Sequence, residues 1–273
     1  YYYSLANKHD KSIDQFVTVS PVICNKLSII LPHRKADIHY CRFPVPSVES
    51  VEKENDLLKI IYCVRNLNEE RKQFKILPLI NERLGAKGLI VNWTIIGEGM
   101  NKQQVENVMQ QHSLISFFPS LPNDRLIKLF PEHDLFILPS LQEGFPVAVV
   151  EAMKAGVVPL VTNWEEATKE LIIENETGYY FKTGDANKYA DTIELLNRNR
   201  NLLKRMAKNG VKKANELFDP YINTIMIEQL ISVSYKVEKK DKKAFKAYGS
   251  RLDNPLMNNT VVNMVRKLKS RIN

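Results

Sequence analysis

The sequence has 273 residues, enough for one large or two ordinary domains, and its 44% hydrophobic and 26% charged residues are typical of a globular protein. It has no run of about 18 apolar residues, so we predict no membrane-spanning helix. The formal charge of +8 comes from residues 235–273, which contain 11 Lys or Arg and 3 Asp or Glu, whereas the rest of the chain has 28 of each sign. Because this basic run matches no nucleic-acid-binding module, we expect no nucleic-acid partner.

The cysteines and histidines do not predict a metal site. Cys24, Cys41 and Cys63 are scattered along the chain, without the close spacing of zinc ligands. We interpret them as reduced thiols in a cytoplasmic protein. His133 precedes an apolar run, and we interpret it as a helix-end or surface histidine.

The N-terminal 46 residues predict a small strand–helix–strand unit. The strands are expected at residues 16–20 and 38–45. Between them, residues 21–31 predict a helix that Ser20 caps. So short a segment cannot form a Rossmann-like domain by itself.

A polar, acidic linker is predicted at residues 47–57, and residues 58–218 then alternate apolar strands with helices. The expected strands are residues 58–64, 89–96, 115–118, 133–138, 157–161 and 179–181. Strands that alternate with helices form parallel sheets covered by those helices. The predicted fold class is therefore α/β, a Rossmann-like parallel sheet flanked by helices.

Ligands of open parallel sheets bind beyond the carboxyl ends of the strands, and two such ends carry candidate residues. Arg65 directly follows the first strand of residues 58–218, and Lys72 lies in the charged cluster Glu-Glu-Arg-Lys, with Arg71 as its rival. Gly97 and Gly99 enclose an acid after the next strand. A Gly-acid-Gly sequence is also compatible with a simple tight turn.

The most informative stretch of the chain, residues 138–156, reads L-P-S-L-Q-E-G-F-P-V-A-V-V-E-A-M-K-A-G. It predicts a polar loop that contains Glu143, then a buried helix from Val147 that ends at Gly156. Pro146 suits the first turn of such a helix, where its missing N–H costs nothing.

This loop and helix predict a binding site for an extended, hydroxylated anion. Unpaired backbone N–H groups at a helix start attract anions such as phosphate, and Gly144 lets a ligand approach the backbone closely. Glu143 could accept hydrogen bonds from hydroxyl groups beside that anion. Glu151 lies two turns farther on, roughly 12 Å away at about 1.5 Å per residue. This spacing suits two parts of one ligand rather than an acid–base pair across a single bond.

Glu143-Gly-Phe-Pro, with Glu151 after seven intervening residues and then Ala-Met-x-Ala-Gly and Pro159, resembles the donor-sugar motif of retaining glycosyltransferase family four. That family has the GT-B architecture of two Rossmann-like domains. The resemblance covers roughly residues 58–218 and, more weakly, 12–45. It implies that residues 1–46 are the end of an N-terminal acceptor domain and that residues 58–218 bind a nucleotide sugar. The alternative is that both acids only cap and solvate a helix.

The resemblance implies a role for each charged candidate. Glu143 would bind hydroxyl groups of the donor sugar, and Glu151 would bind the ribose of the nucleotide. Arg65 and Lys72 would stabilise the negative charge on the leaving diphosphate, in the manner of electrostatic catalysis. Together with the helix start they would neutralise the diphosphate, so no metal and no cofactor are expected.

The remaining donor-binding residues would act through the backbone. The resemblance implies that Gly97 and Gly99 lie near the nucleotide. The N–H groups of Gly144, Phe145 and Val147 would face the sugar and the diphosphate, whereas Pro146 has no N–H to offer.

The chain departs from the family pattern after the strand at 157–161. Residues 163–166 lack the family's Gly-Gly pair and place Trp164 and two acids there. This departure keeps open a nucleotide-sugar-binding module without transfer activity. A GT-B enzyme of other chemistry, such as an epimerase, is the other alternative, whereas the sequence has no signature of the pyridoxal lysine that a phosphorylase needs.

The implied partners are a nucleotide diphosphate sugar and a glycan or lipid-linked glycan acceptor. Because the acceptor side belongs to the N-terminal domain, we expect this chain alone to be inactive. Residues 219–273 predict a helical, basic extension. Within it, residues 261–272 could form a basic amphipathic helix on the cytoplasmic face of an anionic membrane, or could pack back on the protein.

Overall fold

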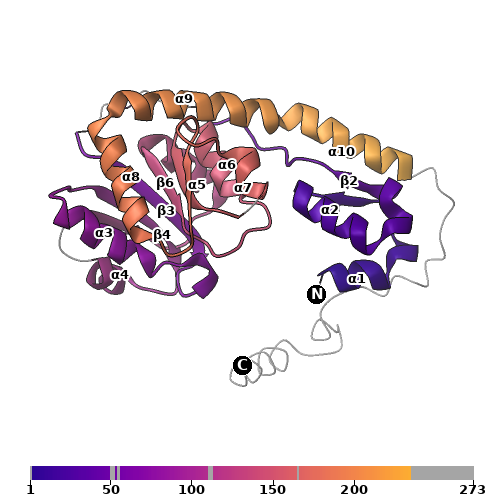
Figure 1. Ribbon diagram of the computed structural model, residues 1–273, viewed down its shortest axis with the longest axis horizontal. Coiled ribbons are helices and arrows are strands. Elements are labelled where there is room, and N and C mark those ends of the chain that lie inside the picture. The colour runs from indigo at the N-terminus through magenta and orange to yellow at the C-terminus, as the bar shows by residue number, and fades with distance from the viewer. Residues whose placement is uncertain (1, 50–52, 54–55, 110–112, 165, 235–273) are drawn as a thin grey trace, which may run out of the picture.

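The computed structural model describes residues 2–49, 53, 56–109, 113–164 and 166–234 (Figure 1). The predicted amphipathic helix at residues 261–272 lies outside the described residues, so membrane contact through it stays a prediction. Within the described ranges, no helix combines the length and the hydropathy needed to cross a bilayer.

A single six-stranded sheet with only parallel pairings forms the centre of the larger part of the chain. The strands are β3 (Lys59–Asn66), β4 (Asn92–Glu98), β5 (Leu114–Phe118), β6 (Leu135–Leu138), β7 (Val158–Thr162) and β8 (Tyr179–Phe181). Their order across the sheet is β5-β4-β3-β6-β7-β8. The predicted α/β fold with a parallel sheet is therefore confirmed.

The second of these strands begins three residues later than the sequence predicted, at Asn92 instead of Leu89. Gly88 has a φ of 68°, and the N–H of Leu89 donates back to the carbonyl of Leu84 (3.0 Å). Leu89 therefore closes the C-terminus of helix α3 (Ile76–Ala86), and the extended backbone starts only after this cap.

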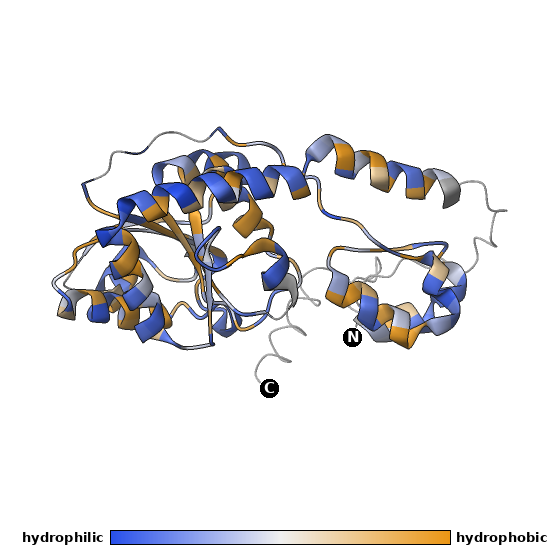
Figure 2. Cartoon of the chain, turned by 45° about the horizontal axis from the view of Figure 1, so that its top comes forward, coloured by the Kyte–Doolittle hydropathy of each residue, from blue (hydrophilic) through white to orange (hydrophobic). Residues whose placement is uncertain are grey.

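Helices cover both faces of the sheet, whose strands are apolar (Figure 2). They are α3, α4 (Lys102–Met109) and α8 (Ala186–Arg198), with α5 (Asn123–Leu129), α6 (Val147–Lys154), α7 (Glu166–Leu171) and α9 (Arg200–Leu217). Side chains of β3 alternate between the faces, as the pleat requires. Ile60 and Tyr62 belong to the cluster with α3 and α8, whereas Ile61 and Cys63 belong to the cluster with α6.

The N-terminal unit is small and has its own core. It comprises α1 (Tyr2–Lys8), β1 (Phe16–Thr18), α2 (Pro21–Ile30) and β2 (Ile38–Tyr40), and the two strands pair in parallel. Its buried core residues are Phe16, Leu27, Leu31 and Ile38. As predicted, the hydroxyl of Ser20 caps α2 by accepting from the N–H of Ile23 (3.3 Å).

Both strands of this unit are shorter than predicted. The first ends at Thr18 because Ser20 is used as the helix cap. The second ends at Tyr40 instead of Val45. Pro44 and Pro46 follow it, and neither has an N–H with which to continue a strand ladder.

The N-terminal unit is joined to the sheet by buried polar contacts. The ammonium of Lys154 on α6 is fully buried and donates to the carbonyls of Val45 (2.5 Å) and Phe218 (2.9 Å). Glu170 on α7 accepts from the Tyr40 hydroxyl (2.6 Å) and pairs with Arg42 (2.8 Å).

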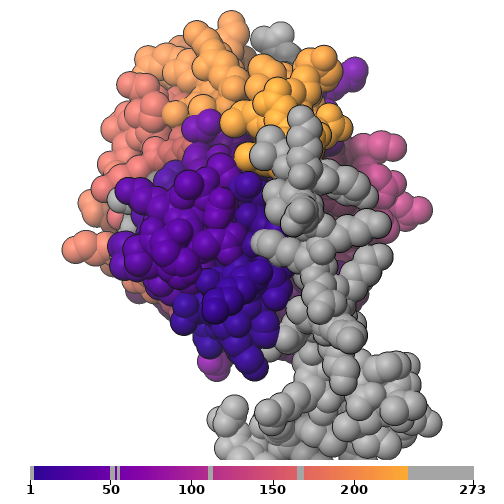
Figure 3. Space-filling view, turned by 90° about the vertical axis from the view of Figure 1, so that its right-hand side faces the viewer, coloured from indigo at the N-terminus to yellow at the C-terminus, as the bar shows by residue number. Residues whose placement is uncertain are grey.

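A second connection runs through helix α10 (Pro220–Ser234), which extends from the end of α9 toward the N-terminal unit (Figure 1). The side-chain amide of Asn223 on α10 donates to the carbonyl of Phe43 (3.2 Å). In the space-filling view α10 lies directly beside the N-terminal unit (Figure 3). The two parts of the chain are therefore tied together at both α6 and α10.

We predict that Lys154→Met lowers the free energy of unfolding by about 2 kcal/mol, because two buried carbonyls lose a charged donor and this loss outweighs the relief of burying an ammonium group. Urea denaturation followed by circular dichroism measures this change. Lys212→Met, at an exposed position of α9, is the control and should leave the midpoint unchanged. Equal midpoints for the two variants would contradict the role assigned to Lys154.

Candidate nucleotide-sugar site

The loops that follow β3 and β6 meet at one edge of the sheet. From β3 the chain moves outward to β4 and β5, and then returns so that β6 pairs with the other side of β3. The connections on the two sides of the boundary between β3 and β6 therefore run outward in opposite directions across the sheet. In open parallel sheets such a reversal of strand order marks the crevice where ligands bind.

Glu143, in the loop after β6, is held by cations from the loop after β3. Its Oε1 lies 2.7 Å from Nζ of Lys72, and its Oε2 lies 3.5 Å from Nη1 of Arg71. The Arg71 side chain also donates to the carbonyl of Gln142 (2.8 Å). The structure thus brings together an acid and two cations that lie about 70 residues apart in the chain.

Lys72 is better placed than Arg71 to act together with Glu143 on one ligand. It makes the shorter contact with Glu143, and its side chain is 17% exposed compared with 43% for Arg71. The buried hydroxyl of Tyr62 donates to the carbonyl of Lys72 (3.1 Å) and holds the 3-10 turn Glu70–Lys72 in place. Arg71 also pairs with Glu69 (2.8 Å), so the geometry favours Lys72 as the cation that shares a ligand with Glu143.

Arg65 lies near the end of β3, as expected, and its side chain is exposed. Among the described residues it forms no hydrogen bond or ion pair. A guanidinium group without a protein partner at the carboxyl edge of a parallel sheet can bind an anion. The structure does not bring Arg65 into contact with Glu143.

The start of α6 differs in detail from the expected geometry. The helix begins at Val147, as predicted, but Pro146 precedes it instead of lying in its first turn, because its ψ of 81° is not helical. The N–H of Val147 donates to the carbonyl of Phe145 (3.1 Å). Among the described residues, the N–H groups of Gly144 and Phe145 have no acceptor, so these two are available to a ligand in this conformation.

Gly144 borders open space. A Cβ atom built at this position would have no other atom within 4 Å, and its φ lies outside the left-handed region. Neither packing nor backbone strain therefore requires glycine here. Phe145, next to it, packs against the rings of Phe43 (5.7 Å) and Phe218 (5.3 Å), so its side chain serves the fold.

Glu151 is buried inside the site, in the second turn of α6. Its Oε1 accepts a hydrogen bond from the side-chain amide of Asn123 (3.2 Å), at the start of α5. Burial raises the pKa of Glu151, and the bond from Asn123 only partly offsets this effect. Asn123 was not among the predicted site residues, and because 28 positions separate the two, no local pattern could have indicated the contact.

Gly97 and Gly99 are explained by the fold alone. A Cβ atom on Gly97 would lie 2.8 Å from the carbonyl oxygen of Val64, and Gly99 has a φ of 97°. Both hold the loop after β3: the carbonyl of Glu98 accepts from Leu67 (2.7 Å). Contact of these glycines with a nucleotide stays a prediction.

Trp164 follows β7 and is 8% exposed, and its indole N–H donates to the carbonyl of Ser140 (2.7 Å). The loop that departs from the family pattern is therefore packed against the loop that carries Glu143. His133 is a helix-end histidine, as predicted, because it caps the 3-10 turn Phe130–Glu132, but it is buried and does not lie at the surface. Its ring nitrogens contact the Leu129 carbonyl and the Thr94 hydroxyl at 2.7 Å each, and burial lowers its pKa.

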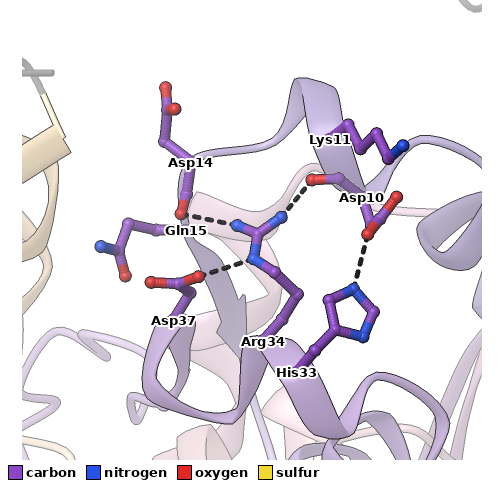
Figure 4. A pocket seen from close by; sticks show the side chains of 7 residues that line it. All are labelled: Asp10, Lys11, Asp14, Gln15, His33, Arg34 and Asp37. Atoms are coloured by element: carbon purple, nitrogen blue, oxygen red, sulfur yellow. Dashed lines mark hydrogen bonds and ion pairs between the residues drawn. The ribbon is translucent and has the colours of Figure 1, made fainter.

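A second pocket lies in the N-terminal unit (Figure 4). It is lined by Asp10, Lys11, Asp14, Gln15, His33, Arg34 and Asp37. The guanidinium of Arg34 binds Asp37 (2.6 Å) and the carbonyls of Asp10, Ile13 (2.6 Å) and Asp14 (3.0 Å). These contacts close a turn of the chain, so the pocket is explained as part of the fold.

In the part of the chain that the structure describes, no three His, Cys, Asp or Glu side chains are close enough to hold a metal ion. The predicted charged residues at the switch point are instead the carboxylates Glu143 and Glu151 and the cations Arg65, Arg71 and Lys72. Two further acids lie at this edge: Glu69, which pairs with Arg71, and the exposed Glu98. This composition suits an anionic ligand with hydroxyl groups. Independence from a metal stays a prediction.

Comparison with known proteins assigns the chain to a family of transferases. Residues 47–213 match the family described as "Glycosyl transferases group 1". The match covers more than half of the chain, so the chain belongs to the group 1 glycosyl transferases.

Relatives by sequence include the capsular polysaccharide biosynthesis glycosyltransferase CapM of Staphylococcus aureus. It is 24% identical over 221 residues, which are 78% of this chain and 57% of CapM. The N,N'-diacetylbacillosaminyl-diphospho-undecaprenol alpha-1,3-N-acetylgalactosaminyltransferase of Campylobacter jejuni is 35% identical over 89 residues, 33% of this chain and 23% of that enzyme.

Solved structures with the same fold include a variant of S. aureus TarM in complex with UDP, with a TM-score of 0.70 at 15% identity. It aligns with 83% of this chain and 45% of the TarM chain. Pneumococcal GtfA in complex with UDP and GlcNAc has a TM-score of 0.64 at 17% identity, over 85% of this chain and 47% of GtfA. The fold is that of GT-B glycosyltransferases, and the chain spans about half the length of these relatives.

We predict that Glu151→Gln stabilises the protein at pH 7 by on the order of 1 kcal/mol. The pKa of Glu151 is raised by folding, so the stability linked to its protonation is present below the unfolded-state pKa and is lost as pH rises through the folded-state pKa. The gain in the variant should therefore disappear below about pH 4. Thermal unfolding at both pH values checks this, with Glu98→Gln, an exposed acid at the same sheet edge, as the unchanged control. A variant that is less stable than the parent at pH 7 would show that the buried charge is better compensated than the structure indicates.

We predict that Gly144→Ala changes the free energy of unfolding by less than about 0.5 kcal/mol, because its Cβ atom meets open space. Gly97→Ala is the matched control and should cost about 2 kcal/mol, because its Cβ atom would overlap the Val64 carbonyl. Urea denaturation of both variants gives the comparison. Similar losses at the two positions would mean that Gly144 also serves packing.

Proposed function

We propose that this chain supplies the donor-binding, C-terminal half of a retaining family-four glycosyltransferase, which transfers a sugar from a nucleotide diphosphate sugar to a glycan or lipid-linked glycan. The observation that carries the proposal is the contact of Glu143 with Lys72 (2.7 Å) at the switch point of the sheet. A carboxylate that can accept from sugar hydroxyls and a cation that can bind diphosphate are within reach of one ligand.

The ion pair between Glu143 and Lys72 has a direct consequence for donor binding. A diphosphate carries more negative charge than one carboxylate, so it competes for Lys72 and draws in the exposed Arg65. Glu143 is then released to accept hydrogen bonds from the sugar. Once bound to the diphosphate, both cations stabilise the charge that grows on it as the glycosidic bond breaks, which is electrostatic catalysis.

Glu151 and Asn123 suit the ribose. A carboxylate has about four acceptor sites, and among the described residues the Oε2 atom of Glu151 accepts no bond. A ribose diol could donate to this carboxylate in a buried setting, where hydrogen bonds to a charged group are strong. The exposed N–H groups of Gly144 and Phe145 would face the diphosphate or the sugar.

The names of the relatives suggest the substrate class. CapM is named for capsular polysaccharide biosynthesis, and the Campylobacter enzyme is named for transfer to a diphospho-undecaprenol-linked sugar. GtfA was solved with UDP and GlcNAc. We therefore propose a UDP-sugar donor and a lipid-linked glycan acceptor held by an acceptor domain, at the cytoplasmic face of a membrane.

A second candidate is a nucleotide-sugar-binding module without transfer activity. The observation that favours it is the loop at Trp164, which packs where the family has a Gly-Gly pair. The two functions share the donor site and differ only in turnover. Sugar transfer by the complete protein, with an acceptor domain present, distinguishes them.

We predict that calorimetric titration of the chain with UDP, GDP and ADP and their sugars finds saturable binding to one nucleotide class. Glu143→Gln should reduce the gain in affinity that the sugar adds to the nucleotide about tenfold, because the carboxylate contacts the sugar. Binding of the free nucleotide should not weaken, because the diphosphate no longer competes with Glu143 for Lys72. Arg65→Ala should weaken both about tenfold, because the diphosphate is common to them.

The control for this titration is Lys102→Ala, a change at an exposed position on α4 that should alter neither affinity. Unchanged binding in both the Glu143 and Arg65 variants would refute the site. Loss of the free nucleotide in Glu143→Gln would place the acid at the nucleotide instead of the sugar.

A further inference from the structure

The loop that carries Glu143 is fixed by two different elements, and only one of them has a role in the site described above. On one side, the carbonyl of Arg71 accepts from the N–H of Leu141 (2.8 Å), and the Arg71 side chain donates to the carbonyl of Gln142 (2.8 Å). Lys72 and Arg71 then bind the carboxylate of Glu143. On the other side, the indole of Trp164 binds the carbonyl of Ser140.

We propose that Trp164 is a positioning residue for Glu143: it holds the base of the sugar-binding loop when the cations of the opposite side turn to the diphosphate. This inference rests on the proposed function. It assigns a role to Trp164, which lies where the chain differs from the family pattern.

Sheet register brings Trp164 to this place. Leu138 of β6 pairs with Val161 of β7. Ser140 follows Leu138 by two residues and Trp164 follows Val161 by three, so both leave the sheet at the same edge. Ser140 is fully buried there, and Trp164 is 8% exposed. Trp164 belongs to the apolar cluster that includes Leu138, Val150 and Leu171, and a large ring surrounded by such neighbours has little freedom to move.

The bond to Trp164 is the polar contact that fixes Ser140. Among the described residues, the hydroxyl of Ser140 has no hydrogen-bond partner, so the residue is held through its backbone carbonyl. Without the indole N–H, this carbonyl of a fully buried residue would be left unpaired, which is costly. The loop would then relax toward a conformation in which the carbonyl reaches a donor.

The two sides of the loop respond differently to a ligand. Lys72 and Arg71 are charged and bind Glu143, so a diphosphate bound in the crevice would attract them away from this carboxylate. The indole of Trp164 is neutral and buried, and a diphosphate does not compete for it. Trp164 therefore keeps Glu143 in position to bind the sugar while the cations move from Glu143 to the diphosphate. Loss of Trp164 should weaken binding of the sugar more than binding of the nucleotide.

The chain contains a matched control for this idea, because it has two tryptophans, and both are buried and donate a hydrogen bond from the indole N–H. Trp93 on β4 is fully buried, and its indole N–H donates to Oδ1 of Asn81 (2.9 Å) in the core. Trp93→Phe and Trp164→Phe remove the same groups from the protein. Only the second change lies at the loop with Glu143.

The experiment compares both variants in two measurements. Hydrogen exchange of peptides that cover residues 139–145 should be faster in Trp164→Phe and unchanged in Trp93→Phe. Calorimetry with the pairs UDP and UDP-GlcNAc, GDP and GDP-mannose, and ADP and ADP-glucose gives the ratio of nucleotide affinity to nucleotide-sugar affinity. Trp164→Phe should reduce the gain in affinity from the sugar about tenfold, and Trp93→Phe should leave this gain intact.

A third variant separates the hydrogen bond from packing. Site-specific replacement of Trp164 by 3-benzothienylalanine keeps the shape of the ring and removes only the N–H donor, so the variant should fold even if Trp164→Phe does not. It should show the same faster exchange and the same smaller gain from the sugar. An unchanged gain in this variant, or equal losses for nucleotide and nucleotide sugar, would overturn the positioning role.

Failure of the proposed function would be recognised separately. If the parent chain binds none of the six ligands, the donor site is wrong and the role of Trp164 in sugar binding falls with it. The exchange measurement still reports whether Trp164 holds the loop. If the parent binds a nucleotide sugar and only the Trp164 results fail, the donor site stands without this residue.

Discussion

Parallel pairing of β3 with β6 is the contact on which the rest of the structure depends. Ile60 pairs with Leu135 and Ile61 with Phe136, and all four residues are fully buried. Because β3 packs on both faces, a slip by one residue would move each side chain into the wrong cluster. The strands run in the same direction, so their carboxyl ends finish together. This single pairing therefore brings the cations after β3 to the acid after β6.

Helix α6 carries two charged residues into the interior, and the protein compensates them unequally. Lys154 donates to two carbonyls and ties the N-terminal unit to the sheet. Glu151 has one bond, from Asn123, and burial raises its pKa. A buried charged side chain that serves the fold normally has its hydrogen bonds supplied by the protein itself. A buried charged side chain in a crevice that the protein compensates only in part points to a ligand. The contrast distinguishes a residue that joins two parts of the fold from one whose carboxylate is only partly compensated by the protein.

The loop after β7 connects the site to the N-terminal unit. Trp164 binds the carbonyl of Ser140 at the base of the Glu143 loop, and the helix that follows carries Glu170, which binds Tyr40 and Arg42. A bulky residue in place of the expected glycines thus forms a hydrogen bond between neighbouring loops.

By itself, the sequence determined the alternation of strands and helices, the parallel sheet, and the loop and helix around Glu143, because periodicity, turn residues and helix starts are local properties. It also restricted the cation to Arg71 or Lys72. Only the tertiary structure decided that Lys72 makes the closer contact, that Asn123 meets Glu151, that Trp164 binds Ser140, and that the fold itself requires a glycine at Gly97 and Gly99. These contacts join residues 24 to 72 positions apart, or depend on a neighbouring loop. Sheet order and register create them, and no local stretch of sequence contains that order.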